Sequence, residues 1–206
     1  MIGIIDYGVG NLFSLRSSFA AIGVEAFVSG EEQELLRADK LILPGVGAFG
    51  DAAEKLRATG LDEFLRRQAE KGVPILGICL GMQLLFEKSF EYGEHPGLGL
   101  LKGTVVGMKD RLPEGLKIPH MGWNALHITQ PDSRLLSRIS EGDFVYFVHS
   151  FYAEGCEASL AATAEYGIPI TAAVEQGNIY GCQFHPEKSG RVGLEILRGF
   201  CQAEGG

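Results

Sequence analysis

The sequence lacks three features that mark large classes of protein: runs of positive charge, long apolar segments and closely spaced cysteines. Its 18 Lys and Arg residues are scattered, and 26 Asp and Glu residues bring the formal net charge to −8, so neither nucleic acid nor an anionic membrane is an expected partner. The longest stretch without a charged residue, 72–86, is 15 residues long, whereas a membrane-spanning helix takes about 20. No transmembrane helix is therefore predicted.

Positive charge is also missing from the start of the chain, because the first cation is Arg16. A secretory signal would begin with a positively charged segment, so a cytoplasmic location is predicted. No two cysteines have CxxC spacing, and no histidine pair has the spacing of a zinc site. We therefore expect no disulfide, no metal and no other cofactor, with free thiols at Cys79, Cys156, Cys182 and Cys201.

What the sequence does contain is enough apolar material for a core, together with an excess of glycine. Hydrophobic residues make up 46% of the 206 residues, and this length favours a single domain that spans 1–206. Glycine supplies 29 residues, about twice its usual share of ~7%. Many tight turns and close backbone approaches are therefore expected.

In the first half of the chain, short apolar runs alternate with amphipathic segments. The runs predict strands at 2–5, 24–28, 41–43 and 73–78, and the segments predict helices at 12–22, at 48–71 with a break at Gly60, and at 80–88. A strand without polar alternation is typical of a parallel sheet that is buried on both faces. The predicted fold class is α/β: a doubly wound, mostly parallel sheet with helices on both faces.

The second half has a different pattern, with shorter strand-like pieces between residues 97 and 187. These pieces lie at 103–106, 144–147, 170–174 and 179–184, and a final helix is predicted over 190–203. We expect hairpins and antiparallel additions to the same sheet in this half.

The sequence Gly77-Ile78-Cys79-Leu80-Gly81 stands where an apolar strand passes into a helix. This pattern is typical of the nucleophile elbow, in which flanking glycines let the chain turn sharply and present a nucleophile above the sheet. A helix N-terminus beside a thiol also favours the thiolate and offers N–H groups to an oxyanion. An inert buried cysteine is the alternative, and the two glycines argue against it.

A cysteine nucleophile needs a base, and that base needs an orienting acceptor. His185 and Glu187 flank a proline after a predicted strand, so in an extended chain their side chains project to the same side. Alone, this tripeptide is more typical of a surface loop than of a catalytic pair, but together with the elbow it predicts a Cys-His-Glu triad. The strip 44–47, Pro-Gly-Val-Gly, follows another strand end and is either a ligand-binding crevice or a simple turn.

The motifs GICLGMQ at 77–83 and QFHPEKS at 183–189 resemble those of the triad-type, or class I, glutamine amidotransferases. In that family a cysteine hydrolyses the side-chain amide of glutamine and the ammonia passes to a synthase. The resemblance implies that Cys79 is the nucleophile, that His185 is the general base and then the acid, and that Glu187 orients His185.

Four further blocks are similar to one branch of that family, the glutaminase subunits of imidazole glycerol phosphate synthase in histidine biosynthesis. They are IDYGVGNLFSL at 5–15, LPGVGAFG at 43–50, PHMGWN at 119–124 and YFVHSFY at 146–152. This resemblance covers nearly the whole chain. It implies a heterodimer with a (βα)8-barrel cyclase, which receives the ammonia.

The same resemblance implies further roles for named residues. It places Gly47, Gln83 and the backbone of Ser150 and Phe151 in the glutamine site. It places Val46, Gly47 and Leu80 at the oxyanion hole. It places four residues at the interface with the cyclase: Asn11, Met121, Trp123 and Lys188. Tyrosine is common in the family where Phe151 stands, so a contact made through a hydroxyl would be lost here, whereas a backbone contact would remain.

Three other functions are compatible with parts of the pattern. A stand-alone cysteine hydrolase would act on esters or peptides without a partner. A glutaminase that supplies a different synthase would share the triad and differ in the PHMGWN and amino-terminal blocks. A non-enzymatic regulatory subunit would not need all three triad residues, and all three are present.

Overall fold

The computed structural model describes residues 1–203, and its largest sheet has eight strands in the order β2-β1-β3-β4-β14-β13-β12-β9. The first five strands of that order run parallel to one another. They are β2 (Ala26–Ser29), β1 (Ile2–Ile5), β3 (Lys40–Leu43), β4 (Ile75–Ile78) and β14 (Ile179–Cys182). The doubly wound α/β fold predicted from the sequence is confirmed, although β2 and β4 begin two residues later than predicted.

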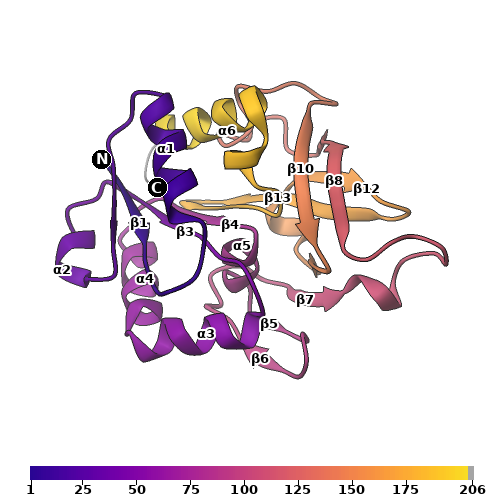
Figure 1. Cartoon of the computed structure of the whole chain (residues 1–206), viewed down its shortest axis with the longest axis horizontal. Helices are drawn as coiled ribbons and strands as arrows, with labels where there is room; N and C mark the ends of the chain where they lie inside the picture. Colours follow the sequence, from indigo (N-terminus) through magenta and orange to yellow (C-terminus); the bar gives the residue numbers. More distant parts are fainter. Residues whose placement is uncertain (204–206) are drawn as a thin grey trace.

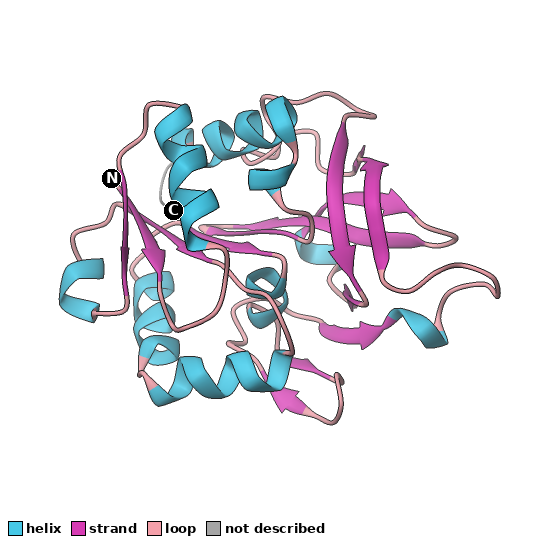
Figure 2. Ribbon diagram, viewed as in Figure 1, coloured by secondary structure: helices cyan, strands magenta, loops and turns pink. Residues whose placement is uncertain are grey.

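Helices cover both faces of this sheet (Figures 1 and 2). On one face lie α1 (Leu12–Ala21) and α6 (Gly190–Gln202), which pack against Ile4 and Ile42. On the other face lie α2 (Glu32–Leu35), α3 (Phe49–Ala58), α4 (Leu61–Glu70) and α5 (Leu80–Leu84). Gly60 has a φ of 72° and separates α3 from α4, as the sequence predicted.

The helix after Cys79 is shorter than the predicted 80–88, and the reason lies in a loop further along the chain. The N–H groups of Leu98 and Leu100 donate to the carbonyls of Leu84 and Leu85 over 2.8 and 2.9 Å. These bonds satisfy carbonyls that a longer helix would use itself. The chain then enters β5 (Lys88–Ser89).

The antiparallel additions predicted for the second half join the main sheet as β13 (Pro169–Gln176), β12 (Leu160–Glu165) and β9 (His127–Ile128). Two predicted strands do not join it, and here the expectation of one sheet was wrong. β10 (Phe144–His149) pairs with β8 (His120–Ala125) in a separate ribbon. β7 (Thr104–Gly107) pairs with β11 (Phe151–Glu154) and β5 in a third sheet, which ends at β6 (His95–Pro96).

The physical reason for the separate ribbon is that β10 is amphipathic. Val145 and Phe147 are buried in the core, whereas Phe144 alternates with them and is 56% exposed. A strand that buries only one face can pack against the side of the core, outside the central sheet. Residues 1–203 also contain three 3-10 turns: η1 (Met108–Asp110), η2 (Glu157–Ser159) and η3 (Pro186–Lys188). Within residues 1–203, no helix is both long and apolar enough to cross a membrane.

Candidate active site

Cys79 stands between β4 and α5 in a backbone conformation that non-glycine residues rarely adopt, with φ 55° and ψ −112°. Its N–H donates to the carbonyl of Cys182 over 2.8 Å. The two flanking glycines are needed for this turn: a Cβ on Gly77 would lie 2.6 Å from the carbonyl oxygen of Gly81, and one on Gly81 would overlap the carbonyl oxygen of Leu43. Close packing around the turn therefore holds Cys79 in its unusual conformation.

This packing predicts a severe effect for Gly81→Ala. The added methyl group would meet the backbone of β3, which has no room to move inside the parallel sheet, so we expect destabilisation by more than about 4 kcal/mol. Urea unfolding measures it. The matched control is Gly107→Ala, whose Cβ would lie 3.5 Å from the Phe151 ring, an ordinary contact. Equal stability of the two variants would contradict the close packing at the elbow.

His185 lies beside Cys79 and is oriented by Glu187. The His185 Nδ1 and Glu187 Oε1 atoms are 2.8 Å apart, and both side chains are almost completely buried. Burial alone would lower the pKa of His185, but hydrogen bonds to Cys79 and Glu187, together with the negative charge of both groups, raise the pKa to about 9. Since Nδ1 is bonded to Glu187, the other ring nitrogen is the one that faces the sulfur.

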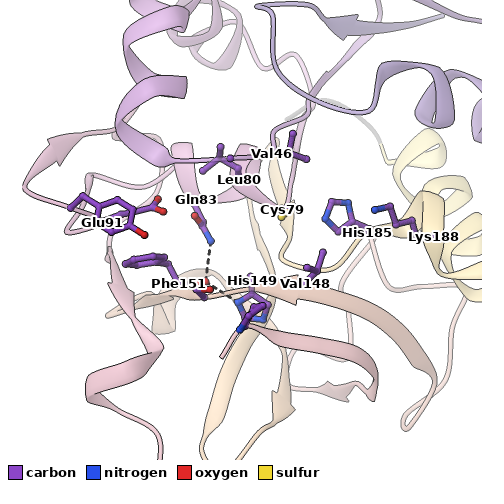
Figure 3. A pocket seen from close by; sticks show the side chains of 14 residues that line it. Val46, Cys79, Leu80, Gln83, Glu91, Val148, His149, Phe151, His185 and Lys188 are labelled. Atoms are coloured by element: carbon purple, nitrogen blue, oxygen red, sulfur yellow. Dashed lines mark hydrogen bonds between the residues drawn. The ribbon is translucent and has the colours of Figure 1, made fainter. Parts of the chain in front are cut away.

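The triad opens into a cavity of about 360 Å³. Every residue that the sequence assigned to the glutamine site or the oxyanion hole lines this cavity, as Lys188 also does. Figure 3 shows Cys79 between Glu91 on one side and His185 and Lys188 on the other. The structure therefore brings together Val46, Gly47, Cys79, Leu80, Gln83, Ser150, Phe151 and His185, with Glu187 behind His185.

The carbonyl of Phe151 is already occupied by two donors. Gln83 Nε2 donates to it over 3.0 Å, and His149 Nδ1 lies 2.8 Å from it. A carbonyl oxygen has two lone pairs, so this oxygen has no further place for a ligand. Any polar contact from Phe151 to a substrate is therefore made by its N–H, and the absence of a tyrosine hydroxyl does not affect it.

Glu91 is the functional candidate that the sequence analysis missed. It is 8% exposed, lines the cavity and accepts a hydrogen bond from the Phe49 N–H over 2.7 Å. Burial raises the pKa of Glu91, against the opposing effect of the Phe49 N–H. No local pattern distinguishes Glu91 from Glu87 or Glu94, because the chain around it forms only a two-residue strand and a turn.

The strip 44–47 passes above the elbow. Gly47 has a φ of 96°, and no atom lies within 4 Å of the position that its Cβ would take. The start of the strip is fixed, because the buried Tyr7 hydroxyl donates to the carbonyl of Pro44 over 2.7 Å. Within residues 1–203, the N–H groups of Val46, Gly47 and Leu80 donate to no other protein group, so they remain available to an oxyanion.

Three of the four residues assigned to a partner gather on one surface. Met121 and Trp123 on β8 are 61% and 55% exposed. The Trp123 ring meets Tyr146 of β10 edge to face at 6.1 Å, and Lys188 Nζ lies 6.0 Å from the centre of the same Tyr146 ring. Asn11 is the N-cap of α1, where its side chain accepts from the Ser14 N–H, and α1 packs against η3, the turn that carries Lys188.

The inward side of the same ribbon carries two buried histidines. His120 Nδ1 and His149 Nε2 are 3.0 Å apart, and the His120 ring is stacked between Phe147 and Tyr166. Burial lowers the pKa of His120 to about 4 and that of His149 to about 3. Both rings are therefore neutral at neutral pH.

These depressed values predict that the protein loses stability in mild acid. The unfolded chain binds protons near its ordinary histidine pKa of ~6.5, whereas the folded rings do not until about pH 4 or below, so stability falls as pH drops through that window. We expect a loss of about 1 kcal/mol or more between about pH 6.5 and pH 5. Urea unfolding at both pH values measures it, and His149→Gln should reduce the loss. An equal loss of stability in the parent and in His149→Gln would show that this histidine pair does not cause the acid sensitivity.

Within residues 1–203, no group of three His, Cys, Asp or Glu side chains is arranged to hold a metal ion. All four cysteines are unpaired thiols. The expected absence of a cofactor stays a prediction.

Comparisons with known proteins agree with this geometry. The family model for class I glutamine amidotransferases matches residues 3–203. Imidazole glycerol phosphate synthase subunit HisH of Bacillus licheniformis is 56% identical over 98% of this chain and 96% of its own, and HisH of Caldanaerobacter subterraneus is 53% identical over 97% of each. The solved structure of PurLQS from Thermotoga maritima shares the fold, with a TM-score of 0.76 at 22% identity over 97% of this chain and 96% of that one.

Proposed function

This chain belongs to the class I glutamine amidotransferases, and we propose that it is the glutamine-hydrolysing subunit of an imidazole glycerol phosphate synthase in histidine biosynthesis. The relatives that bear this subunit's name are about half identical to the chain over nearly its whole length. The observation that carries the chemistry is the buried group of Cys79, His185 and Glu187 at the floor of the cavity. The matched range 3–203 supports a single domain over 1–206.

Cys79 acts as the nucleophile. Its sulfur attacks the side-chain carbonyl carbon of glutamine, and the carbonyl oxygen becomes an oxyanion. The N–H groups at Val46, Gly47 and Leu80 are the donors for that oxygen, because they line the cavity around the sulfur and are otherwise unused.

His185 supplies and recovers the proton. With its pKa raised to about 9, the ring carries the proton that the departing amide nitrogen needs at neutral pH. Ammonia leaves and a thioester forms on Cys79. His185, now neutral, takes a proton from water, the water oxygen displaces the sulfur, and glutamate is released. Glu187 keeps the ring oriented throughout both steps.

Glu91 binds the α-ammonium group of glutamine in this proposal. It is the acidic side chain that faces the cavity from the side opposite His185 (Figure 3), and a buried carboxylate pairs well with a cation. The N–H groups of Ser150 and Phe151 are left for the α-carboxylate, because the Phe151 carbonyl is occupied.

Glu91→Gln should therefore raise the KM for glutamine with little change in kcat. The amide oxygen still accepts from Phe49, but the charge is lost, which costs about 1.5–3 kcal/mol, or a factor of about 10 to 100 in KM. Saturation curves of the assembled synthase measure this. Glu94→Gln is the control, since Glu94 is exposed and pairs with Lys88. An unchanged KM for Glu91→Gln would mean that another residue binds the ammonium group.

The partner in this proposal is a (βα)8-barrel cyclase that docks on the surface formed by Met121, Trp123, Tyr146 and Lys188. This surface is apolar apart from Lys188, and Lys188 also lines the catalytic cavity. A dry contact of this kind lets ammonia pass without protonation in bulk water. The predicted cytoplasmic location and the predicted lack of nucleic-acid and membrane partners stay predictions.

One assay separates this function from its alternatives. Glutamate release from glutamine is measured with and without the barrel cyclase, next to a panel of esters and peptides. Glutamine turnover that depends on the cyclase supports the proposal. Ester or peptide turnover by the chain alone would favour a stand-alone hydrolase, and stimulation by another synthase would assign the chain to that enzyme.

A further inference from the structure

A hydrogen-bonded chain leads from the wall of the cavity to the nucleophile. Gln83 Nε2 donates to the Phe151 carbonyl and also to Gln183 Oε1, over 3.0 Å in each case. Gln183 Nε2 lies 3.8 Å from Cys79 Sγ, within hydrogen-bonding reach of a sulfur. Gln183 is 0% exposed and does not line the cavity.

The carbonyl oxygen of Phe151 determines which atom donates in each of these hydrogen bonds. The Phe151 carbonyl only accepts, so Gln83 must present its nitrogen to it. The same nitrogen is the atom that meets Gln183, so Gln183 must present its oxygen there. Its own nitrogen then has one orientation left, toward the sulfur of Cys79. The amide of Gln183 is therefore fixed by its neighbours, although a glutamine oxygen and nitrogen are otherwise hard to tell apart.

The backbone fixes the position of Gln183 as well. It follows β14, and its N–H donates to the Ala172 carbonyl of β13 over 2.9 Å. The side chain is completely buried, with its oxygen bonded to Gln83 and its nitrogen directed at Cys79. An amide held in this way donates without the entropy loss that a mobile donor pays on forming the bond.

We propose that Gln183 is a further catalytic residue of this enzyme, whose amide N–H stabilises the thiolate form of Cys79. The inference rests on the proposed role of Cys79 as the nucleophile. A thiolate accepts a hydrogen bond more strongly than a thiol, so a fixed donor favours ionisation of the sulfur. His185 supplies a second donor from the cavity side, and Gln183 supplies its donor from the core.

The test is the pH profile of Cys79 alkylation by iodoacetamide, which reports the thiolate directly. Gln183→Glu keeps an oxygen for Gln83 and replaces the donor to sulfur with an acceptor. Gln183→Met removes both bonds at similar volume. We expect the midpoint of the profile to move up by about one pH unit in Gln183→Met, because a hydrogen bond to a charged group contributes about that much, and by more in Gln183→Glu, whose carboxylate also repels the thiolate. Glutamine kcat at neutral pH should fall in Gln183→Met by up to about tenfold, the largest change in ionised fraction that a shift of one pH unit produces, and the KM of Gln183→Glu should stay close to that of the parent.

The matched control is Gln68→Glu, because Gln68 is also buried but lies in α4, away from the site. It should leave the alkylation midpoint in place. A purely structural role for Gln183 would lower stability, or change KM, without moving the midpoint. A Gln183→Glu protein that binds the cyclase and has the parent's midpoint would overturn the proposal; if Gln183→Glu does not fold, the midpoint of Gln183→Met decides in the same way.

Failure of this inference is distinguishable from failure of the proposed function. If Cys79→Ala retained glutamine turnover, the nucleophile would be misassigned whatever the Gln183 profiles showed. If Cys79→Ala is inactive and the midpoint does not move, only the role of Gln183 is wrong.

Discussion

Cys79→Ala is expected to abolish glutamine-dependent synthesis by the assembled enzyme and to leave ammonia-dependent synthesis intact. In the proposed mechanism the Cys79 sulfur forms the thioester, and no other cysteine lines the cavity. Removing a covalent nucleophile typically costs on the order of 10⁴-fold or more. Ammonia added to the solution bypasses the step, because the proposed cyclase partner can use it without glutamine hydrolysis. The measurement is product formation with glutamine and with ammonium salt, side by side.

The matched control is Cys201→Ala. Cys201 is a free, half-buried thiol on α6, near Lys40 at the start of β3 and the amino group of Met1. It should retain both activities. Retention of glutamine-dependent synthesis by Cys79→Ala would refute the nucleophile assignment, and loss of the ammonia-dependent activity would show that the substitution disturbs the partner rather than the chemistry.

The parts of the fold that the sequence predicted well are those whose cause is local. The apolar strands of the first half and the break at Gly60 follow from residue patterns a few positions long. The elbow is local too, because a strand, a cysteine and two glycines suffice to define the turn at Cys79. His185 and Glu187 do meet, with Nδ1 and Oε1 2.8 Å apart, but the extended chain that the sequence predicted there was wrong, because residues 186–188 form a 3-10 turn.

The parts that the sequence did not predict depend on residues that are distant along the chain. Whether β10 joins the main sheet or pairs with β8 depends on which elements pack against its buried face. The sequence of β10 alone does not specify those elements. Glu91 lies two residues beyond β5, which pairs with β7, and its carboxylate accepts from the N–H of Phe49, 42 residues earlier in the chain. The direction of the Gln183 amide depends on Phe151 and Gln83, both far from it in sequence.

The arrangement of the ribbon suggests how a partner on the outer surface would influence the site. Along β8, Met121 and Trp123 face outward while His120 alternates with them and faces inward. His120 meets His149, and His149 meets the carbonyl of Phe151 at the cavity wall. This path of two hydrogen bonds joins β8, whose outer face carries Met121 and Trp123, to the backbone that is proposed to hold glutamine.

Glutamine turnover by the free chain is accordingly expected to be at least about 10² to 10³ times slower than turnover by the complex with substrate-bound cyclase. That factor is the cost of losing one oxyanion donor. The strip at 44–47 is the part of the site whose backbone can turn an N–H group toward the sulfur or away from it. Tyr7 holds Pro44, whereas Gly47 has open space around it. A free chain whose kcat already equals that of the complex would contradict this.

Gly47→Ala isolates the backbone contribution to that stimulation. A methyl group at Gly47 would touch nothing within 4 Å, so the substitution acts only by penalising the φ of 96°. We expect alkylation of Cys79 to continue at the parent's rate while stimulated kcat falls by about 10²-fold, since the thiol remains and a donor to the oxyanion is misplaced. Gly23→Ala is the matched control, because Gly23 has a φ of 76° and equally open surroundings but lies in the turn after α1. If both variants kept full stimulation, the strip would be a fixed turn, and the dependence on the partner would have to arise at the glutamine-binding wall instead.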